Sequence, residues 1–171
     1  VGRVQPAHDD LEKETGEAIA RSGIDRGDVF VTSKLANDSH LPDDARRAFD
    51  GTLGALGFDY IDLFLIHWPL PMRYGGDFVS NWETLQEFYR DGRARSIGVS
   101  NFQPHHLRRL DAECEVPPAV DQIEVHPYLT QNDVRASCAE HQIAIEAWSP
   151  LARGGELLRE PTIASIAQRA G

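Results

Sequence analysis

Polar side chains that could do chemistry recur at or near the ends of five apolar runs. In chain order they are Lys34, His67, Ser100 with Asn101, Gln122, and Trp148 with Ser149. A desolvated lysine can lower the pKa of an acidic neighbour or form a Schiff base, and a histidine can polarise a carbonyl group or act as a general acid or base. Hydroxyl and amide groups suit a neutral amide ligand, and an indole offers a flat face for stacking.

Each of these residues also has an interpretation without chemistry. Lys34 could be a solvated lysine at a strand end, because lysine is rarely fully buried. His67 could be a hydrogen-bonded histidine of the core. Asp62, inside the second run, is better explained as a structural hydrogen-bonding carboxylate than as a catalyst. The recurrence of polar groups in run after run favours a shared site.

Other candidates for binding are weaker. The loop SPLARGG (149–155) could contact a phosphate through backbone N–H groups and Arg153, or could simply be a flexible surface loop. Cys138 with His141 invites a metal interpretation, but no ligand set has zinc spacing, so we expect no metal site. We expect His105 and His106 to lie exposed in the first turn of a helix.

The elements that must position these residues alternate along the chain. Strands are predicted at Asp28–Leu35, Tyr60–Trp68, Ala94–Asn101, Pro118–Pro127 and Ile143–Leu151. Helices are predicted at Pro42–Gly57, Asn81–Asp91, from Pro104, at Gln131–His141 and at Glu160–Ala170. The first of these helices begins with a proline and two aspartates and closes at Gly57, which is the expected chemistry of its two ends.

Strict alternation of strands and helices predicts an α/β fold with a parallel sheet. A doubly wound sheet would lead us to expect GxGxxG after a strand, and the sequence has none. A (β/α)8 barrel predicts polar residues at the carboxyl ends of successive strands, as found here. Such a barrel takes about 250 residues and five strands cannot close it. We therefore predict one domain over residues 1–171, an incomplete barrel of about five βα units.

Composition narrows the class of protein. The 171 residues carry 17 Lys and Arg against 27 Asp and Glu, a formal charge of −10, which disfavours nucleic acid as a partner. No apolar run approaches the roughly 20 residues of a membrane span, so we expect no membrane association and a cytoplasmic location. Two cysteines without a CxxC pair suit a reducing compartment. The oligomeric state does not follow from the sequence.

Four motifs carry a resemblance to a known family. LGFDYIDLFLIHWP, SIGVSNF, AVDQIEVHPYLTQ and IEAWSPLARGG occur in the order seen in aldo-keto reductases, in particular bacterial members of the 2,5-diketo-D-gluconate reductase type. The resemblance covers Glu12 to Gly171. It implies a (β/α)8 barrel that transfers a hydride from NADPH to a small aldehyde or ketone.

The resemblance also implies roles for individual residues. In the family a tyrosine donates a proton to the carbonyl oxygen, a lysine lowers the pKa of the tyrosine, an aspartate pairs with the lysine, and a histidine orients the carbonyl. Lys34 matches the lysine and His67 the histidine. Matches to the cofactor site are Ser100, Asn101 and Gln122 on the nicotinamide carboxamide, Trp148 stacked on the ring, and Ser149 and Leu151 along the pyrophosphate.

The chain departs from the family pattern at both ends. Alignment through Glu12 and Gly16 places Asp9 where the family has its tyrosine and Leu11 where it has an asparagine. All four tyrosines follow Lys34. The first two family strands with the aspartate, and the last part with the arginine for the 2′-phosphate, have no match. A carboxyl group is largely ionised at neutral pH and is a poor substitute for the tyrosine.

Three hypotheses follow. The first is a truncated NADPH-dependent reductase with little activity of its own, whose exposed strand edges would invite pairing with other chains. The second is a non-catalytic nicotinamide-binding or regulatory module. The third is a different barrel enzyme in which Lys34 forms a Schiff base.

Overall fold

The structure, a computed structural model, describes residues 2–4 and 9–170. Its strands are β1 (Gly2–Val4), β2 (Val29–Leu35), β3 (Leu63–Ile66), β4 (Ile97–Ser100), β5 (Val120–Glu124) and β6 (Ala144–Trp148). Its α-helices are α1 (Asp9–Ser22), α2 (Pro42–Leu56), α3 (Val79–Arg90), α4 (Pro104–Glu113), α5 (Asn132–Glu140) and α6 (Pro161–Ala170). Three 3-10 turns are η1 (Arg26–Asp28), η2 (Tyr74–Gly76) and η3 (Leu157–Arg159).

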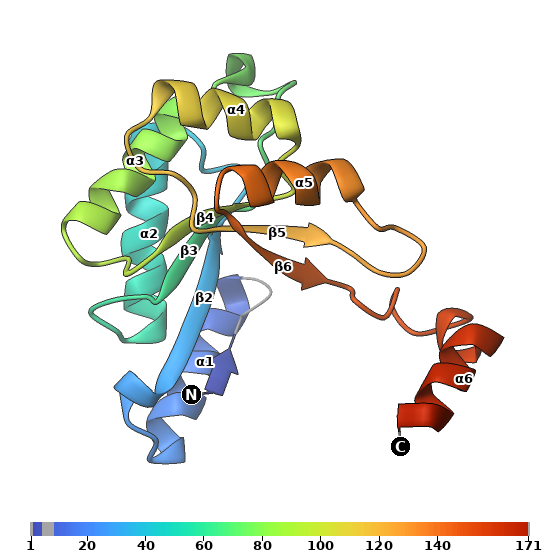
Figure 1. Cartoon of the computed structure of the whole chain (residues 1–171). Coiled ribbons are helices and arrows are strands. Elements are labelled where there is room, and N and C mark those ends of the chain that lie inside the picture. Colours follow the sequence, from blue (N-terminus) through green and yellow to red (C-terminus); the bar gives the residue numbers. More distant parts are fainter. Residues whose placement is uncertain (1, 5–8, 171) are drawn as a thin grey trace.

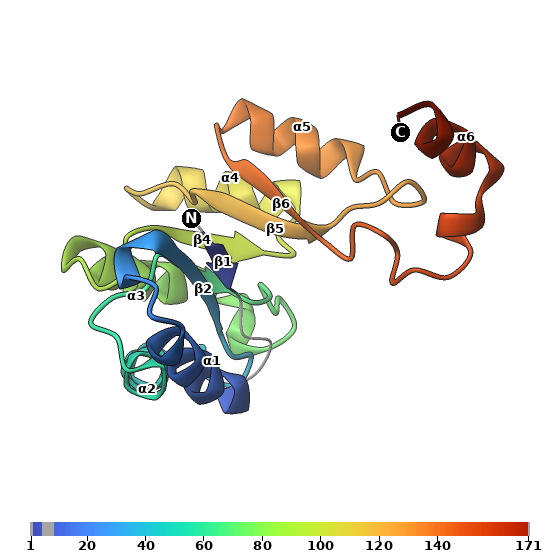
Figure 2. The same cartoon turned by 90° about the horizontal axis from the view of Figure 1, so that it is seen from below.

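The strands of the described chain form one parallel sheet in the order β1-β2-β3-β4-β5-β6. Helices α1 to α5 cover one face of the sheet, and the sheet curls around its other face (Figure 1, Figure 2). α6 lies away from the sheet, beyond the loop that follows β6 (Figure 1). The architecture is an incomplete (β/α)8 barrel, which confirms the predicted fold class.

The five predicted strands correspond to β2 to β6, and the structure shortens them. β3, for example, is Leu63–Ile66 rather than Tyr60–Trp68. Ile61 still forms an isolated parallel bridge with Ala94, so the pairing is interrupted at Asp62 rather than absent. The predicted helices correspond to α2 to α6, with ends that agree within two residues.

β1 and α1 are additions that the sequence patterns did not predict. β1 has three residues and pairs with the start of β2, with Gly2 opposite Val29, which is too short for a recognisable alternation. In α1 the buried positions are Glu12, Gly16 and Ile19, which have the helical spacing i, i+4, i+7. Two of these three positions hold a carboxylate and a glycine, so the sequence lacks the apolar stripe by which an amphipathic helix is recognised.

The hydrophobic core lies between the sheet and its covering helices. Its centre is the aromatic group Phe49, Phe64 and Phe88, with ring centroids of Phe49 and Phe88 4.1 Å apart and stacked. The alternate residues of β3, Leu63 and Leu65, are buried on the inner face of the curl and stand outside this cluster. At β3 the sheet therefore has two buried faces, as expected for parallel strands.

Asp62 has the structural role predicted for it. Its Oδ2 accepts a hydrogen bond from the N–H of Val31 at 2.9 Å and pairs with Arg26 at 2.8 Å. Arg95 pairs with the same carboxylate at 3.4 Å, and both guanidinium groups lie over the ring of Tyr60. This cluster lies at the amino ends of the strands, opposite the pocket described below, so it stabilises the sheet.

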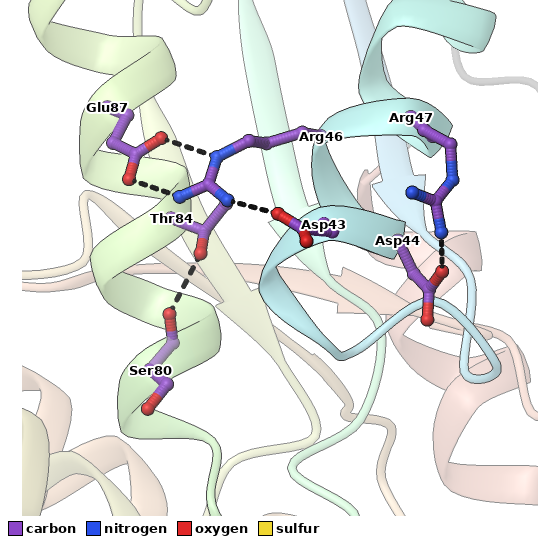
Figure 3. Close-up of polar contacts among 7 residues, drawn as sticks. All are labelled: Asp43, Asp44, Arg46, Arg47, Ser80, Thr84 and Glu87. Carbon is purple, nitrogen blue, oxygen red and sulfur yellow. Dashed lines mark hydrogen bonds and ion pairs between the residues drawn. The ribbon is translucent and has the colours of Figure 1, made fainter.

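Exposed ion pairs connect α2 and α3 (Figure 3). Arg46 of α2 donates two hydrogen bonds to Glu87 of α3, at 2.9 and 2.8 Å, and a third to Asp43 at 2.8 Å. Such exposed pairs contribute little to stability on average. As predicted, α2 begins at Pro42, and Gly57 closes it in a left-handed conformation (φ 70°).

The prediction for the two consecutive histidines is half wrong. His105 is exposed, but His106 is buried, and its Nδ1 accepts a hydrogen bond from the N–H of Gln103 at 3.1 Å. Its ring packs against Phe78 and Phe102, and burial lowers its pKa to about 4. The imidazole of His106 occupies a position on the inward face of α4 where an apolar side chain would be expected. Its burial therefore cannot be predicted from the residue type alone.

The described residues contain neither a metal-binding cluster nor a membrane-spanning helix. No group of three or more His, Cys, Asp or Glu side chains in residues 2–4 and 9–170 is arranged to hold a metal ion. No helix in those same ranges is both long and apolar enough to span a bilayer.

Candidate functional site

A pocket of about 320 Å³ opens at the carboxyl ends of β2 to β6. The described residues that line it are Lys34, His67, Trp68, Ser100, Asn101, Gln122, Glu146, Ala147 and Trp148. They come from five consecutive strands or from the residues directly after them. The curl of the sheet turns these strand ends toward one another, as in barrels whose active sites lie at this end.

Strand register places the side chains on the inner face. Lys34 lies opposite Leu65 of β3, which lies opposite Gly98 of β4. Two residues further along β4, a second row runs from Ser100 to Gln122 and then to Glu146. Because the side-chain period of a strand is two, both rows point into the curl.

The strands pack closely at Gly98, two residues before Ser100 in β4. A Cβ atom added there would lie 2.6 Å from the carbonyl oxygen of Val120 and 2.8 Å from Cδ2 of Leu65. The absence of a side chain lets β4 approach its neighbours closely, below the row of polar residues.

Asn101 connects four of the five strand ends. Its N–H donates to the carbonyl oxygen of Gln122 at 3.0 Å, and its Nδ2 donates to the carbonyl oxygen of His67 at 2.9 Å. Its Oδ1 accepts a hydrogen bond from Nε1 of Trp148 at 3.0 Å. Asn101 adopts a left-handed conformation (φ 63°), which asparagine tolerates better than most residues.

Serine and glutamine side chains complete the polar wall. The hydroxyl of Ser100 donates to the carbonyl oxygen of Gln122 at 2.7 Å and accepts from Nδ2 of Asn101 at 3.0 Å. Nε2 of Gln122 donates to Oε1 of Glu146 at 3.0 Å. Ser100 and Gln122 are both buried. The wall is therefore a connected network with fixed side-chain directions.

Lys34 and His67 lie at the other side of the pocket. Burial lowers the pKa of Lys34, and the negative charge of Glu146 opposes that shift. His67 follows directly after β3 rather than within it, and its ring centroid is 6.5 Å from that of Trp68. The pocket thus joins a partly desolvated amine, an imidazole, two amides and two indoles.

A buried histidine lies in the loop after β2. His40 stacks on Tyr74, with ring centroids 5.3 Å apart, and the hydroxyl of Tyr74 donates to the carbonyl oxygen of Asn37. Burial, aided by the charge of Arg73, lowers the pKa of His40 to about 4. His40 is therefore neutral at physiological pH and packs as an aromatic side chain.

Most of the predicted site residues converge, and two do not. Lys34, His67, Ser100, Asn101, Gln122 and Trp148 all line the pocket. Ser149 and Leu151 do not line it; Leu151 is 56% exposed, in a turn where Ser149 is left-handed (φ 48°). The turn leads the chain away from the strand ends toward η3. Asp9 begins α1, but its side chain lies outside the described part of the structure.

Sequence reasoning missed Glu146, Trp68 and Ala147. Glu146 lies two residues before Trp148 in one strand, so the two share a face, and that spacing could have found it. Trp68 is the last residue of the predicted strand Tyr60–Trp68, but β3 ends at Ile66, so the alternation of side chains in a strand does not indicate the direction of this 41% exposed indole.

Fold and pocket together define an α/β protein of the (β/α)8 barrel type, with an amide-lined site at the carboxyl ends of its strands. The model of the aldo/keto reductase family matches residues 10–163, and the chain belongs to this family.

Individual relatives agree with this assignment. The chain is 46% identical to an aldo-keto reductase of Mycobacterium sp. (strain KMS), over 94% of this chain and 57% of the relative. It is 42% identical to glyoxal reductase of Bacillus subtilis (strain 168), over 92% and 55%. Among solved structures, an aldo-keto reductase of Bombyx mori in complex with NADP superposes with a TM-score of 0.84 at 36% identity, covering 94% of this chain and 58% of that one. The chain spans little more than half the length of these relatives.

Proposed function

We propose that this chain supplies the nicotinamide end of an NADPH-dependent reductase that converts small aldehydes or ketones to alcohols. The observation that carries the proposal is the convergence of Lys34, His67, Asn101, Gln122 and Trp148 on one pocket. The family membership, the relative solved with NADP and the relative named glyoxal reductase support it. The formal charge of −10 disfavours nucleic acid as a partner, and we propose a small carbonyl compound as the substrate and the cytoplasm as the location.

The residues present fit a nicotinamide group. Its carboxamide has one acceptor oxygen and two N–H donors. The donors of Asn101 and Ser100 are engaged within the wall, but Oδ1 of Asn101 and Oγ of Ser100 each have a second lone pair for the N–H groups, and the amide of Gln122 can serve the oxygen. The bond from Nε1 of Trp148 to Asn101 fixes the plane of an indole beside this wall, where it can cover one face of a flat ring. Ser149 and Leu151 follow in the turn where the pyrophosphate would leave the pocket.

Each residue would have a distinct task in the reaction. When bound, NADPH supplies the hydride. Asn101 and Gln122 hold the ring orientation, while the indole of Trp148 excludes water from one face. His67 orients the carbonyl group of the substrate, and the ammonium group of Lys34 favours the anionic form of a neighbouring proton donor and so lowers its pKa.

We further propose that this chain lacks the tyrosine that donates the proton in its family. The described residues that line the pocket include no tyrosine. Alignment of the sequence motif through Glu12 and Gly16 puts Asp9 in the place of that tyrosine, and a carboxyl group there would be mostly ionised at neutral pH. We therefore propose that the 171-residue chain binds NADPH but turns over carbonyl substrates slowly or not at all.

The same observation motivates a second candidate, a nicotinamide-binding module without catalysis. Turnover separates the two functions. Aldehyde-dependent oxidation of NADPH by this chain, or by a longer form that carries a tyrosine donor, supports the reductase; binding without turnover in both supports the module. Borohydride trapping of a carbonyl compound on Lys34 would instead favour a Schiff-base enzyme.

Binding of NADPH tests the proposal directly. Trp68 and Trp148 line the pocket, so quenching of tryptophan fluorescence reports occupancy. Gln122→Ala should weaken binding about tenfold, the equivalent of one or two hydrogen bonds, because it removes an amide from the wall. Gln168→Ala, in exposed α6, is the matched control and should bind like the parent chain. No quenching by NADPH at millimolar concentration would reject the proposed function.

A further inference from the structure

One charged side chain of the pocket has no task in the proposed reaction. Glu146 lies in β6, two residues before Trp148, and lines the pocket from the inner face of the sheet. The residue is half-buried. A charged group is costly to place beside indoles unless it has partners, so the partners of Glu146 indicate what it does.

The strand register brings Glu146 directly beside Gln122. The two residues lie opposite one another in the parallel pair of β5 and β6, and Gln122 lies opposite Ser100 of β4. Nε2 of Gln122 donates a hydrogen bond to Oε1 of Glu146 at 3.0 Å. Gln122 itself is buried. Glu146 is therefore the last member of the polar row that forms the wall, and it contacts the amide that we assign to the nicotinamide group.

A carboxylate selects one of the two orientations of an amide. An ionised carboxyl group only accepts hydrogen bonds, whereas a glutamine amide has a donor end and an acceptor end. Rotation of the Gln122 amide by half a turn would put its oxygen against the carboxylate oxygen of Glu146, and a charge-assisted hydrogen bond would become a repulsion. Nε2 carries two N–H groups, and a second N–H is the kind of donor that the carboxamide oxygen of nicotinamide requires. The direction of the Gln122 amide thus depends on the charge of Glu146.

The pocket also supplies a positive charge near Glu146. Lys34 of β2 lines the same pocket. Burial lowers the pKa of Lys34, and the negative charge of Glu146 opposes this shift. The two opposite charges therefore attract one another within the pocket, where either one alone would be unfavourable.

We propose that Glu146 is a positioning residue of the nicotinamide site, whose carboxylate fixes the amide of Gln122 in the orientation that binds the carboxamide group. Glu146 touches neither cofactor nor substrate in this scheme and acts through Gln122. The proposal rests on the proposed function of the pocket, because the carboxamide of NADPH is the group that the amide holds. A cross-strand pair can also stabilise a sheet without any effect on a ligand, and the affinity for the cofactor separates these two roles.

Affinity for NADPH, measured by tryptophan quenching, is the first test. Glu146→Gln keeps the shape but not the charge, so affinity should fall about fivefold, the difference between a hydrogen bond to a charged group and one to a neutral group. In the background of Gln122→Ala the same change should alter affinity by less than about twofold, because the group through which it acts is gone. Glu140→Gln removes a carboxylate from the exposed end of α5 and is the matched control, which should bind at least as tightly as the parent. Parent-like affinity of Glu146→Gln, or an equal loss in both backgrounds, would overturn the proposal.

The sign of the effect strengthens this test. NADPH carries negatively charged phosphates, so removal of a carboxylate near the pocket should by itself strengthen binding through long-range electrostatics. Weaker binding by Glu146→Gln is opposite to that effect of net charge and requires the local contact with Gln122.

The side-chain amide of Gln122 gives a second readout that needs no cofactor. Its NMR signals are the pair that disappears in Gln122→Ala. At one pH, exchange of these protons with solvent should be faster in Glu146→Gln than in the parent chain, because the charge-assisted bond that protects the Nε2 proton is weakened. Equal exchange would overturn the proposal even if NADPH binds. If NADPH binds to neither chain while the exchange rates still differ, the proposed function fails and the orientation of Gln122 by Glu146 stands.

Discussion

At the scale of residues, the pocket depends most on how Asn101 is held. Its three side-chain contacts reach the residue after β3, the last residue of β4 and the last residue of β6. A small change in the backbone of Asn101 would therefore change the orientation of the polar wall and of the Trp148 indole together. The residues that hold the wall in place become as relevant to binding as the residues that contact the ligand.

Asp121, a fully buried residue of β5, should make the stability of the fold depend on pH. Burial raises its pKa to about 7 in the folded chain, against 3.8 for the unfolded reference, so the folded state binds more protons between these values. The free energy of unfolding should therefore fall as pH rises from about 4 to about 7 and then level off, by at most about 4 kcal/mol. Asp121→Asn should remove this contribution, so it should gain stability relative to the parent at pH 8. Urea unfolding at several pH values measures both.

The two thiols should differ in reactivity. Cys138 is fully buried, and burial with the nearby Asp121 raises its pKa to about 12; Cys114 is partly exposed, with a pKa raised to about 11. Because the thiolate is the reactive form, a thiol reagent at pH 8 should label Cys114 slowly and Cys138 only after unfolding. Cys114→Ser isolates Cys138 for this measurement. Rapid labelling of Cys138 in the folded chain would contradict its burial.

The sequence predicted most of the pocket because chemistry and position coincide there. Lys34, Ser100, Gln122 and Trp148 lie in strands whose ends can be read from apolar runs. Leu151 was placed at the cofactor by resemblance alone, and the left-handed residues of its turn, which set its direction, leave no clear signal in the residue types. His106 was misplaced because its burial depends on which face α4 turns inward.

At the scale of elements, the close approach of α1 to α2 depends on Gly16. A Cβ atom there would lie 2.1 Å from the carbonyl oxygen of Leu56, the last residue of α2. Backbone atoms cannot give way as a side chain does, so Gly16→Ala should destabilise the fold by about 1–3 kcal/mol. Gly54→Ala, in the same helix pair, meets nothing within 4 Å and should stabilise it by about 0.4–1 kcal/mol. Urea unfolding of both variants tests this contrast, and a neutral Gly16→Ala would show that the helices are free to separate.

The contact between Gly16 and the end of α2 also explains why the hydrophobic pattern did not predict α1. The buried face of a helix can normally be recognised in the sequence from regularly spaced apolar residues. α1 instead buries Glu12, whose Oε1 accepts a hydrogen bond from the Ser33 hydroxyl at 2.5 Å, and Gly16. Each of these two residues is explained by a tertiary partner. The Ser33 hydroxyl, on the helix-facing side of β2, hydrogen-bonds to Glu12, and the end of α2 packs against Gly16. Such partners cannot be identified until the sheet and α2 are placed.

At the scale of the whole molecule, the incomplete barrel leaves β6 with one neighbour. In the described chain β6 pairs only with β5, and Ile145 on its outer face is 38% exposed. A parallel edge with an exposed apolar residue is a template for pairing with another chain. We therefore expect this chain to self-associate as its concentration rises, with β6 at the contact.

Sedimentation velocity over a range of concentrations tests this expectation. Ile145→Lys places a charge on the edge strand and should shift association to higher concentration, because an inserted lysine must be desolvated for two edges to meet. Thr162→Lys adds the same charge to exposed α6 and should leave association unchanged if β6 is the contact. A chain that stays monomeric throughout would show that the curl of the sheet, which carries the edge strands away from a flat geometry, protects β6 without a covering element.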